Sequence, residues 1–210
     1  MTAPTKSPAT GQDEVVAFLA GGAGSGVPAR HIDTHISIVF LAPDRVLKIK
    51  RAIKLPFLDN STLEARRRCC DEELAVNARH APQIYRRVVP ITRGANGLEL
   101  GGSGPAVEWA VEMARFDENR TLDHLAAAHA LPHDAADALA ETMRTSHASA
   151  PVVAKASWPA SIATIIDRNT EKFREQSTLA MADVERLQQL SHRRLRDHLP
   201  LLQRRAEAGL

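Results

Sequence analysis

Two lysines and two glutamates could form the ion pair of a phosphate-binding site. Lys48 and Lys50 alternate in an apolar segment typical of a β-strand, so both side chains should lie on one face of a sheet. Glu72 and Glu73 follow in a helix expected over residues 62–79. A strand lysine paired with a glutamate of the next helix can hold phosphates, although a lone strand lysine is more often a solvated edge residue. The sequence leaves open which lysine and which glutamate pair, and we favour Lys48 with Glu73.

The pattern of apolar residues predicts the elements that position these side chains. Residues 36–40 alternate in a strand-like way and a turn follows at residues 42–45, so the lysine strand is the second strand of a hairpin. Ser61 and Glu64 have the spacing of a capping box at the start of the helix, and Pro82 ends it. Further strands are expected at residues 85–92, 98–100 and 107–113. The region therefore predicts a sheet of about five strands with one helix inserted.

The segments that precede and follow this sheet region in the sequence are predicted to be mainly helical. A helix over residues 13–20 precedes a glycine-rich linker over residues 21–26, which lacks the Lys and Ser or Thr that complete a P-loop. The pattern changes from mixed to all-helical at about residue 118. Helices are expected at residues 122–129, 134–147, 160–175 and 183–203, with Pro200 ending or kinking the last one.

Composition argues against several kinds of partner. The chain has 27 Lys and Arg residues against 25 Asp and Glu, so no overall charge draws it to nucleic acid. No apolar run approaches the roughly 20 residues that span a membrane. The histidines and cysteines lack the spacing of a zinc site, and we expect no metal-ligating set.

Cys69 and Cys70 are adjacent in the expected helix, where their side chains diverge, so we expect free thiols and a reducing, cytoplasmic compartment.

The order of these elements resembles the small lobe of a protein kinase followed by the start of its large lobe. The stretches HISIVFLAPDRVLKIK, LPFLDNSTLEARRR and DEELAVNARHAPQIYRRVVPIT are similar to the aminoglycoside phosphotransferase-like kinases, in a bacterial branch sometimes fused to a P-loop kinase domain. The resemblance covers residues 30–125, and more loosely the helices beyond. It implies an α+β fold with a nucleotide-holding small lobe at 12–118 and an incomplete helical large lobe at 119–210. Residues 1–11 are expected to be a disordered tail because they are rich in Thr, Pro, Ala and Ser.

The resemblance also implies ATP with Mg²⁺ as cofactors and a set of nucleotide-binding residues. These residues are Ser37, Lys48, Glu73, Glu112, Met113 and Ala114. The loop that ends at Ser37 would lie near the phosphates, which Lys48 would contact with Glu73 as its partner. Residues 112–114 would form a hinge that contacts adenine through backbone groups.

The catalytic loop of that family is not found in the sequence. The family uses a His-Gly-Asp loop with a following Asn and a later Asp, whereas this chain contains no His-Gly-Asp and stops at Leu210, where the loop would follow. We therefore expect a truncated, nucleotide-binding portion of an ATP-dependent small-molecule kinase that is inactive alone, with no catalytic residues of its own. The alternative is a non-catalytic module that pairs with another chain, or self-associates, through an exposed helical surface.

Overall fold

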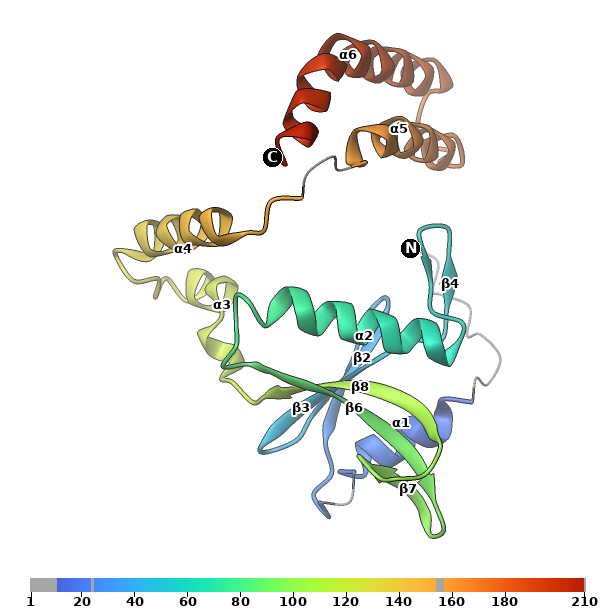
Figure 1. The fold of residues 1–210 in the computed structure, drawn as a ribbon, viewed down its shortest axis with the longest axis vertical. Helices are drawn as coiled ribbons and strands as arrows, with labels where there is room; N and C mark the ends of the chain where they lie inside the picture. The colour runs from blue at the N-terminus through green and yellow to red at the C-terminus, as the bar shows by residue number, and fades with distance from the viewer. Residues whose placement is uncertain (1–10, 24, 154–156, 210) are drawn as a thin grey trace. The chain divides into compact units, whose positions relative to one another are not determined.

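The computed structural model describes residues 11–23, 25–153 and 157–209, which belong to two compact units. The sheet unit comprises residues 1–133 and the helical unit residues 134–210 (Figure 1). The chain thus divides after residue 133, whereas the change to all-helical sequence comes at about residue 118. The tail expected over residues 1–11 lies outside the described residues, apart from Gly11.

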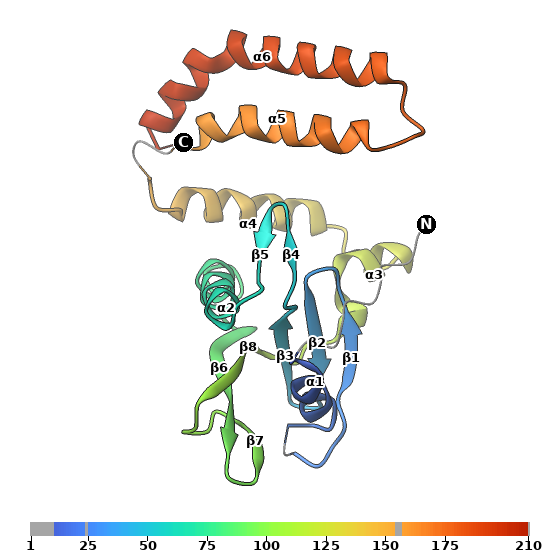
Figure 2. The ribbon, with the colours of Figure 1, turned by 90° about the vertical axis from the view of Figure 1, so that its right-hand side faces the viewer.

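The sheet unit is built on a curled, antiparallel six-stranded sheet (Figure 2). Its strands, in spatial order, are β1 (Arg30–Asp33), β2 (Ser37–Leu41), β3 (Arg45–Lys50), β8 (Ala106–Ala114), β6 (Tyr85–Gly94) and β7 (Gly97–Leu100). A separate two-stranded hairpin consists of β4 (Lys54–Leu55) and β5 (Leu58–Asp59). The α+β class is confirmed. The expected count of about five strands was too low because β1, with all four residues exposed, lacks an apolar alternation.

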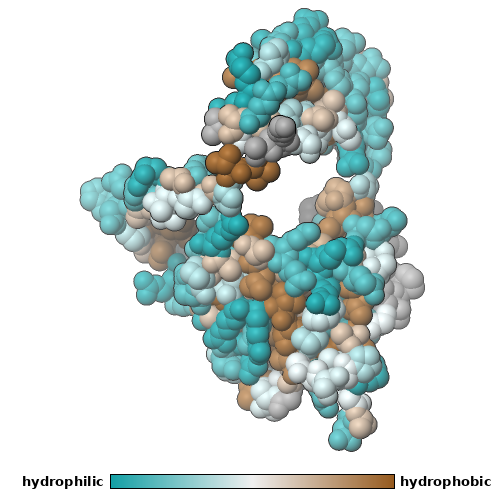
Figure 3. Space-filling view, viewed as in Figure 1, coloured by the Kyte–Doolittle hydropathy of each residue, from teal (hydrophilic) through white to brown (hydrophobic). Residues whose placement is uncertain are grey.

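Helices cover both faces of this sheet, as the period-two pattern of its strands requires. Helix α1 (Asp13–Ala20) packs Val15 and Leu19 against one face, in a core that includes Phe40 and Ile49. Helix α2 (Leu63–Asn77) covers the other face, where the buried Cys70 lies in a second cluster. Figure 3 shows apolar side chains between α2 and the strands beneath it, flanked by hydrophilic residues.

The start of α2 differs from the expected capping box. Thr62 is the N-cap residue, and its hydroxyl accepts a hydrogen bond of 3.1 Å from the backbone N–H of Ala65. The hydroxyl of Ser61 instead donates to Asp59, 2.5 Å away. The capping-box prediction was therefore wrong by one residue, because two consecutive hydroxyl residues offered two candidate caps and Asp59 binds the first.

The remaining elements are helices. The sheet unit ends with the 3₁₀ helix η1 (Glu118–Arg120) and α3 (Leu122–Ala127), and the helical unit contains α4 (Ala135–Ser149), α5 (Trp158–Arg174) and α6 (Met181–Glu207). Helices α5 and α6 pack against each other as a hairpin (Figure 2). Helix α6 continues through Pro200 and bends towards its C-terminal end, so the proline does not end it. In the described ranges, no helix is both long and apolar enough to cross a bilayer.

Candidate functional site

Glu73 of α2 binds both lysines of β3. Its Oε1 accepts a hydrogen bond of 2.8 Å from Lys48 Nζ, and its Oε2 accepts one from Lys50 Nζ. Both lysines reach Glu73 because alternate residues of β3 face α2. The neighbouring Glu72 is exposed. In the structure, therefore, Glu73 is the glutamate of the ion pair, and it binds both lysines.

This three-residue cluster is largely shielded from solvent. The side chain of Glu73 is 10% exposed, that of Lys50 9% and that of Lys48 26%. Burial alone would raise the pKa of Glu73, but the hydrogen bonds and charges of the two lysines outweigh it and place the pKa below its ordinary value of 4.5. The cluster therefore carries one carboxylate between two ammonium groups, with a net positive charge.

Ser37 lies next to the lysine cluster. It is the β2 residue directly opposite Lys50, so the two side chains share one face of the sheet. Ser37 is 1% exposed, and its hydroxyl has no hydrogen-bond partner in the part of the chain that the structure describes. Its backbone N–H donates to the hydroxyl of Thr34, which closes the β1–β2 turn. The structure thus places Ser37 opposite Lys50, on the sheet face that also carries Lys48, and both lysines bind Glu73.

The three expected hinge residues lie at the end of β8, inside the sheet. Glu112 and Met113 pair with β3 on one side and with β6 on the other, and the N–H of Ala114 donates to Ile84. The carboxylate of Glu112 accepts a hydrogen bond of 2.7 Å from Arg87, on the sheet face opposite the lysines. The side chain of Glu112 is therefore not brought to the lysine cluster.

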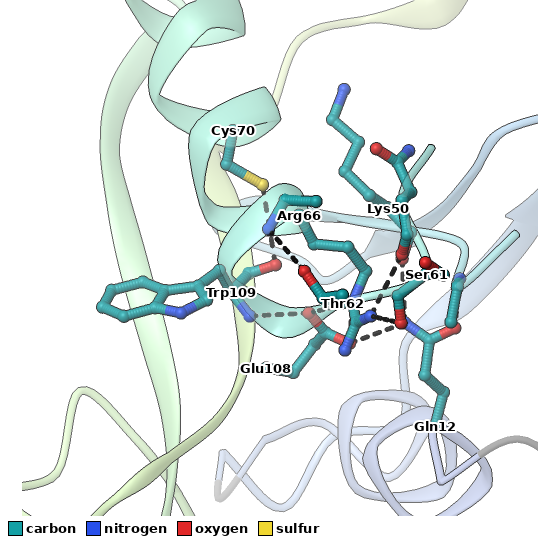
Figure 4. A network of polar contacts seen from close by, with 11 residues as sticks. Gln12, Lys50, Ser61, Thr62, Arg66, Cys70, Glu108 and Trp109 are labelled. Atoms are coloured by element: carbon teal, nitrogen blue, oxygen red, sulfur yellow. Dashed lines mark hydrogen bonds and ion pairs between the residues drawn. The ribbon is translucent and has the colours of Figure 1, made fainter. Parts of the chain in front are cut away.

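A second polar network, absent from the sequence interpretation, is centred on Glu108 of β8 (Figure 4). This residue is fully buried, and Arg66 Nε lies 2.9 Å from each of its two carboxylate oxygens. Gln12 Nε2 donates to the same carboxylate at 2.6 Å, and the backbone N–H of Trp109 donates to it at 2.9 Å. Four hydrogen bonds from three elements thus compensate the buried charge.

The sequence carried a signal for this network. Glu108 interrupts the apolar run of its strand, and Arg66 lies one helical turn before the buried Cys70, on the same side of α2. A charged residue at each of two core-facing positions indicates a buried pair. The next residue, Arg67, faces outward, and its guanidinium carbon lies 4.5 Å from the ring centroid of Trp109.

No cluster of three His, Cys, Asp or Glu side chains that could hold a metal ion occurs among the residues described. This finding concerns the protein side chains alone. The phosphates of a nucleotide supply metal ligands of their own, so few protein ligands are required for Mg²⁺.

Comparison with known proteins identifies distant relatives and no function. No family model matches the chain, and no solved structure matches it. It is 31% identical over 115 residues to uncharacterized proteins of Mycobacterium bovis and of two strains of Mycobacterium tuberculosis. The matched region is 55% of this chain and 22% of each relative, so the match spans about a fifth of the curated relatives' length.

Proposed function

We propose that the sheet unit is the nucleotide-holding small lobe of an ATP-dependent small-molecule phosphotransferase, of the aminoglycoside phosphotransferase-like kind, in a cytoplasmic setting. The observation that carries this proposal is the carboxylate of Glu73, which is held between two lysines of one strand face. A kinase-like small lobe uses a strand lysine that is oriented by a helix glutamate to hold nucleotide phosphates. The sequence contains no His-Gly-Asp loop, so the activity proposed for this chain is nucleotide binding and not phosphoryl transfer.

The surroundings of the cluster fit a phosphate group. A phosphate oxygen could accept the hydrogen bond that the buried hydroxyl of Ser37 has available. Lys48 is the more exposed of the two lysines, so it is the one proposed to turn towards a ligand while Lys50 continues to neutralise Glu73. The adenine contacts are proposed for the segment around residues 112–114 and the residues that follow it as the chain leaves β8. Mg²⁺ would be held chiefly by the phosphates, and we assign no protein ligand to it.

Thermal unfolding with and without millimolar Mg·ATP tests this proposal. A ligand that binds the folded state raises the unfolding free energy, by about 2.7 kcal/mol at a hundredfold excess over Kd. We expect a rise in Tm that Lys48→Ala reduces strongly and Lys50→Ala reduces less. Lys54→Ala is the matched control, since that lysine is 75% exposed and pairs with Asp59. Folded protein whose Tm does not respond to ATP would overturn the proposal.

A second candidate function is that of an interaction module, and the helical unit carries the observation that favours it. Helix α4 has no buried residue, and its Leu139 and Met143 are 47% and 51% exposed, one turn apart. Adjacent exposed apolar residues on one helix face could form part of a surface that binds another protein. Sedimentation of the wild-type chain and of Leu139→Glu/Met143→Glu tests for self-association. If both proteins were monomeric at all concentrations, self-association of this chain through α4 would be excluded.

A further inference from the structure

We propose that Glu108 is a positioning residue for the lysine cluster. Through Arg66 it fixes the helix that bears Glu73, and through Gln12 it fixes the strand that bears the two lysines. Its effect on nucleotide affinity rests on the function proposed above, whereas its effect on the geometry of the cluster does not. Glu108 would not contact the nucleotide.

The link to the helix runs through the first turns of α2. Arg66 Nε donates to both carboxylate oxygens of Glu108, and Arg66 Nη1 donates to the backbone carbonyls of Asn60 and Ser61 at 3.1 and 3.2 Å. The arginine thus joins β8 to the connection that leads into α2. Glu73 lies seven residues further on, two helical turns or about 10 Å along the same side of the helix. A shift of Arg66 is therefore carried to Glu73 by a rigid element.

The link to the strand runs through Gln12, the N-cap residue of α1. Gln12 Nε2 donates one hydrogen bond to Glu108 and another, of 2.8 Å, to the backbone carbonyl of Lys50. Its Oε1 accepts a hydrogen bond of 2.8 Å from the N–H of Ala52. The backbone on both sides of the C-terminal end of β3 is therefore held by one side chain, which Glu108 orients.

Both partners of the ion pair are thus fixed to the same carboxylate. Charge-assisted hydrogen bonds require close approach, and Lys48 Nζ lies 2.8 Å from Glu73. If Glu108 no longer held Arg66 and Gln12, the helix and the strand could separate independently of each other. A residue with only a structural role would change stability but leave the lysine–glutamate geometry of the folded state unchanged.

Titration of the Glu73 carboxyl group by carbon-13 NMR tests this geometry without any ligand. We expect the pKa of Glu73 to rise towards 4.5 in Glu108→Gln, because the lysines withdraw. Gln12→Ala, which leaves the Arg66–Glu108 pair intact, is the milder variant and should shift it in the same direction. Phe40→Leu is the control, since it weakens the core on the opposite face. An unchanged Glu73 titration in folded Gln12→Ala and Glu108→Gln would overturn the proposal.

A double-mutant cycle with Lys48→Ala then tests the effect on binding. Glu108→Gln should weaken ATP binding by roughly five- to tenfold in the wild-type background, as is usual for residues coupled through one network. In the Lys48→Ala background it should have no further effect on affinity while still lowering Tm. An equal loss of affinity in both backgrounds would contradict action through the lysine. If wild-type protein binds no ATP, the proposed function fails, and the Glu73 titration still decides the positioning role.

Discussion

Glu73 uses both carboxylate oxygens to bind cations, and this makes its protonation a determinant of stability. Its folded-state pKa is depressed below 4.5, so its contribution is complete above the unfolded-state pKa and is lost as pH falls through the folded-state pKa. Of the two lysines bound to Glu73, Lys48 is the one proposed to contact an anionic ligand. The loss of stability on acidification and the proposed anion binding therefore both involve Glu73.

We predict that Glu73→Gln lowers the free energy of unfolding at pH 7 by about 2 kcal/mol, because charge-assisted hydrogen bonds are lost. The difference from wild type should begin to shrink below about pH 4.5, where the unfolded-state carboxyl group becomes protonated, and should continue to shrink down to the lower folded-state pKa. Urea titrations between pH 7 and pH 3.5 measure it. Glu72→Gln is the control, because this exposed neighbour should show no such convergence. If the difference in unfolding free energy between Glu73→Gln and wild type did not change with pH, the pairing of Glu73 with the two lysines would be contradicted.

The two adjacent cysteines should differ sharply in reactivity. Burial raises the pKa of the Cys70 thiol to about 12, and the side chain is fully buried, whereas Cys69 is partly exposed. At pH 8.5 we expect iodoacetamide to alkylate Cys69 alone, as read by peptide mass spectrometry. Cys69→Ser should then take up no label until urea unfolds the protein. Labelling of native Cys70 at the rate of Cys69 would contradict the packing of α2.

At the scale of elements, local patterns predicted more of the fold than of the site. The strands β2, β3 and β8 and the extent of α2 could be predicted, since the strands are rich in apolar residues and the helix has recognisable start and end signals. The exposed β1 and the two-residue strands β4 and β5 carry no periodic signal and were not predicted. Periodicity indicated which face the lysines share, but not that one glutamate binds both. It also could not show that Glu108 would meet Arg66, because their pairing depends on how α2 crosses the sheet.

The start of α2 offers a direct test of this structure. Thr62→Ala removes the hydroxyl that caps the helix, and we expect a loss of about 1 kcal/mol in the free energy of unfolding. Ser61→Ala should cost less, because that hydroxyl contacts only the exposed Asp59 side chain among the described contacts. Urea denaturation followed by circular dichroism compares the two. If Ser61→Ala instead destabilised the protein more than Thr62→Ala, Ser61 would be the capping residue.

Pro200 should weaken α6. A proline inside a helix removes one backbone hydrogen bond and crowds the preceding turn, so we expect Pro200→Ala to stabilise the helical unit by about 1–3 kcal/mol. His198→Ala, at an exposed position of the same helix, should change stability by less than about 0.7 kcal/mol. Chemical denaturation followed by helix ellipticity measures both. Equal effects would mean that the bend in α6 has a cause other than the proline.

At the scale of the whole molecule, the two units differ in how much they bury. The sheet unit has two apolar clusters, whereas the buried residues described in the helical unit are Pro159, Thr170, Val184 and Ala206. A unit with little buried apolar surface has little stability of its own. The helical unit should therefore unfold first.

Each unit contains one of the two tryptophans, Trp109 in the sheet unit and Trp158 in the helical unit. We predict that urea unfolding of Trp158→Phe, observed through Trp109, occurs at higher urea than unfolding of Trp109→Phe, observed through Trp158. Wild-type ellipticity, which follows both units at once, should show two transitions and serves as the control. Mg·ATP should shift only the transition reported by Trp109. One coincident transition for both probes would show that the units fold as a single cooperative body.

Two neighbouring arginines of α2, Arg66 and Arg67, contact two neighbouring residues of β8, and their side chains point in different directions. Arg66 lies inward on Glu108, while Arg67 lies outward over the ring of Trp109. Neighbouring side chains of a helix point about 100° apart, so the two contacts resist rolling of the helix in both senses. We therefore expect α2 to resist rotation about its own axis. Any movement of α2 that separates Glu73 from the lysines must instead slide or tilt the helix as a whole.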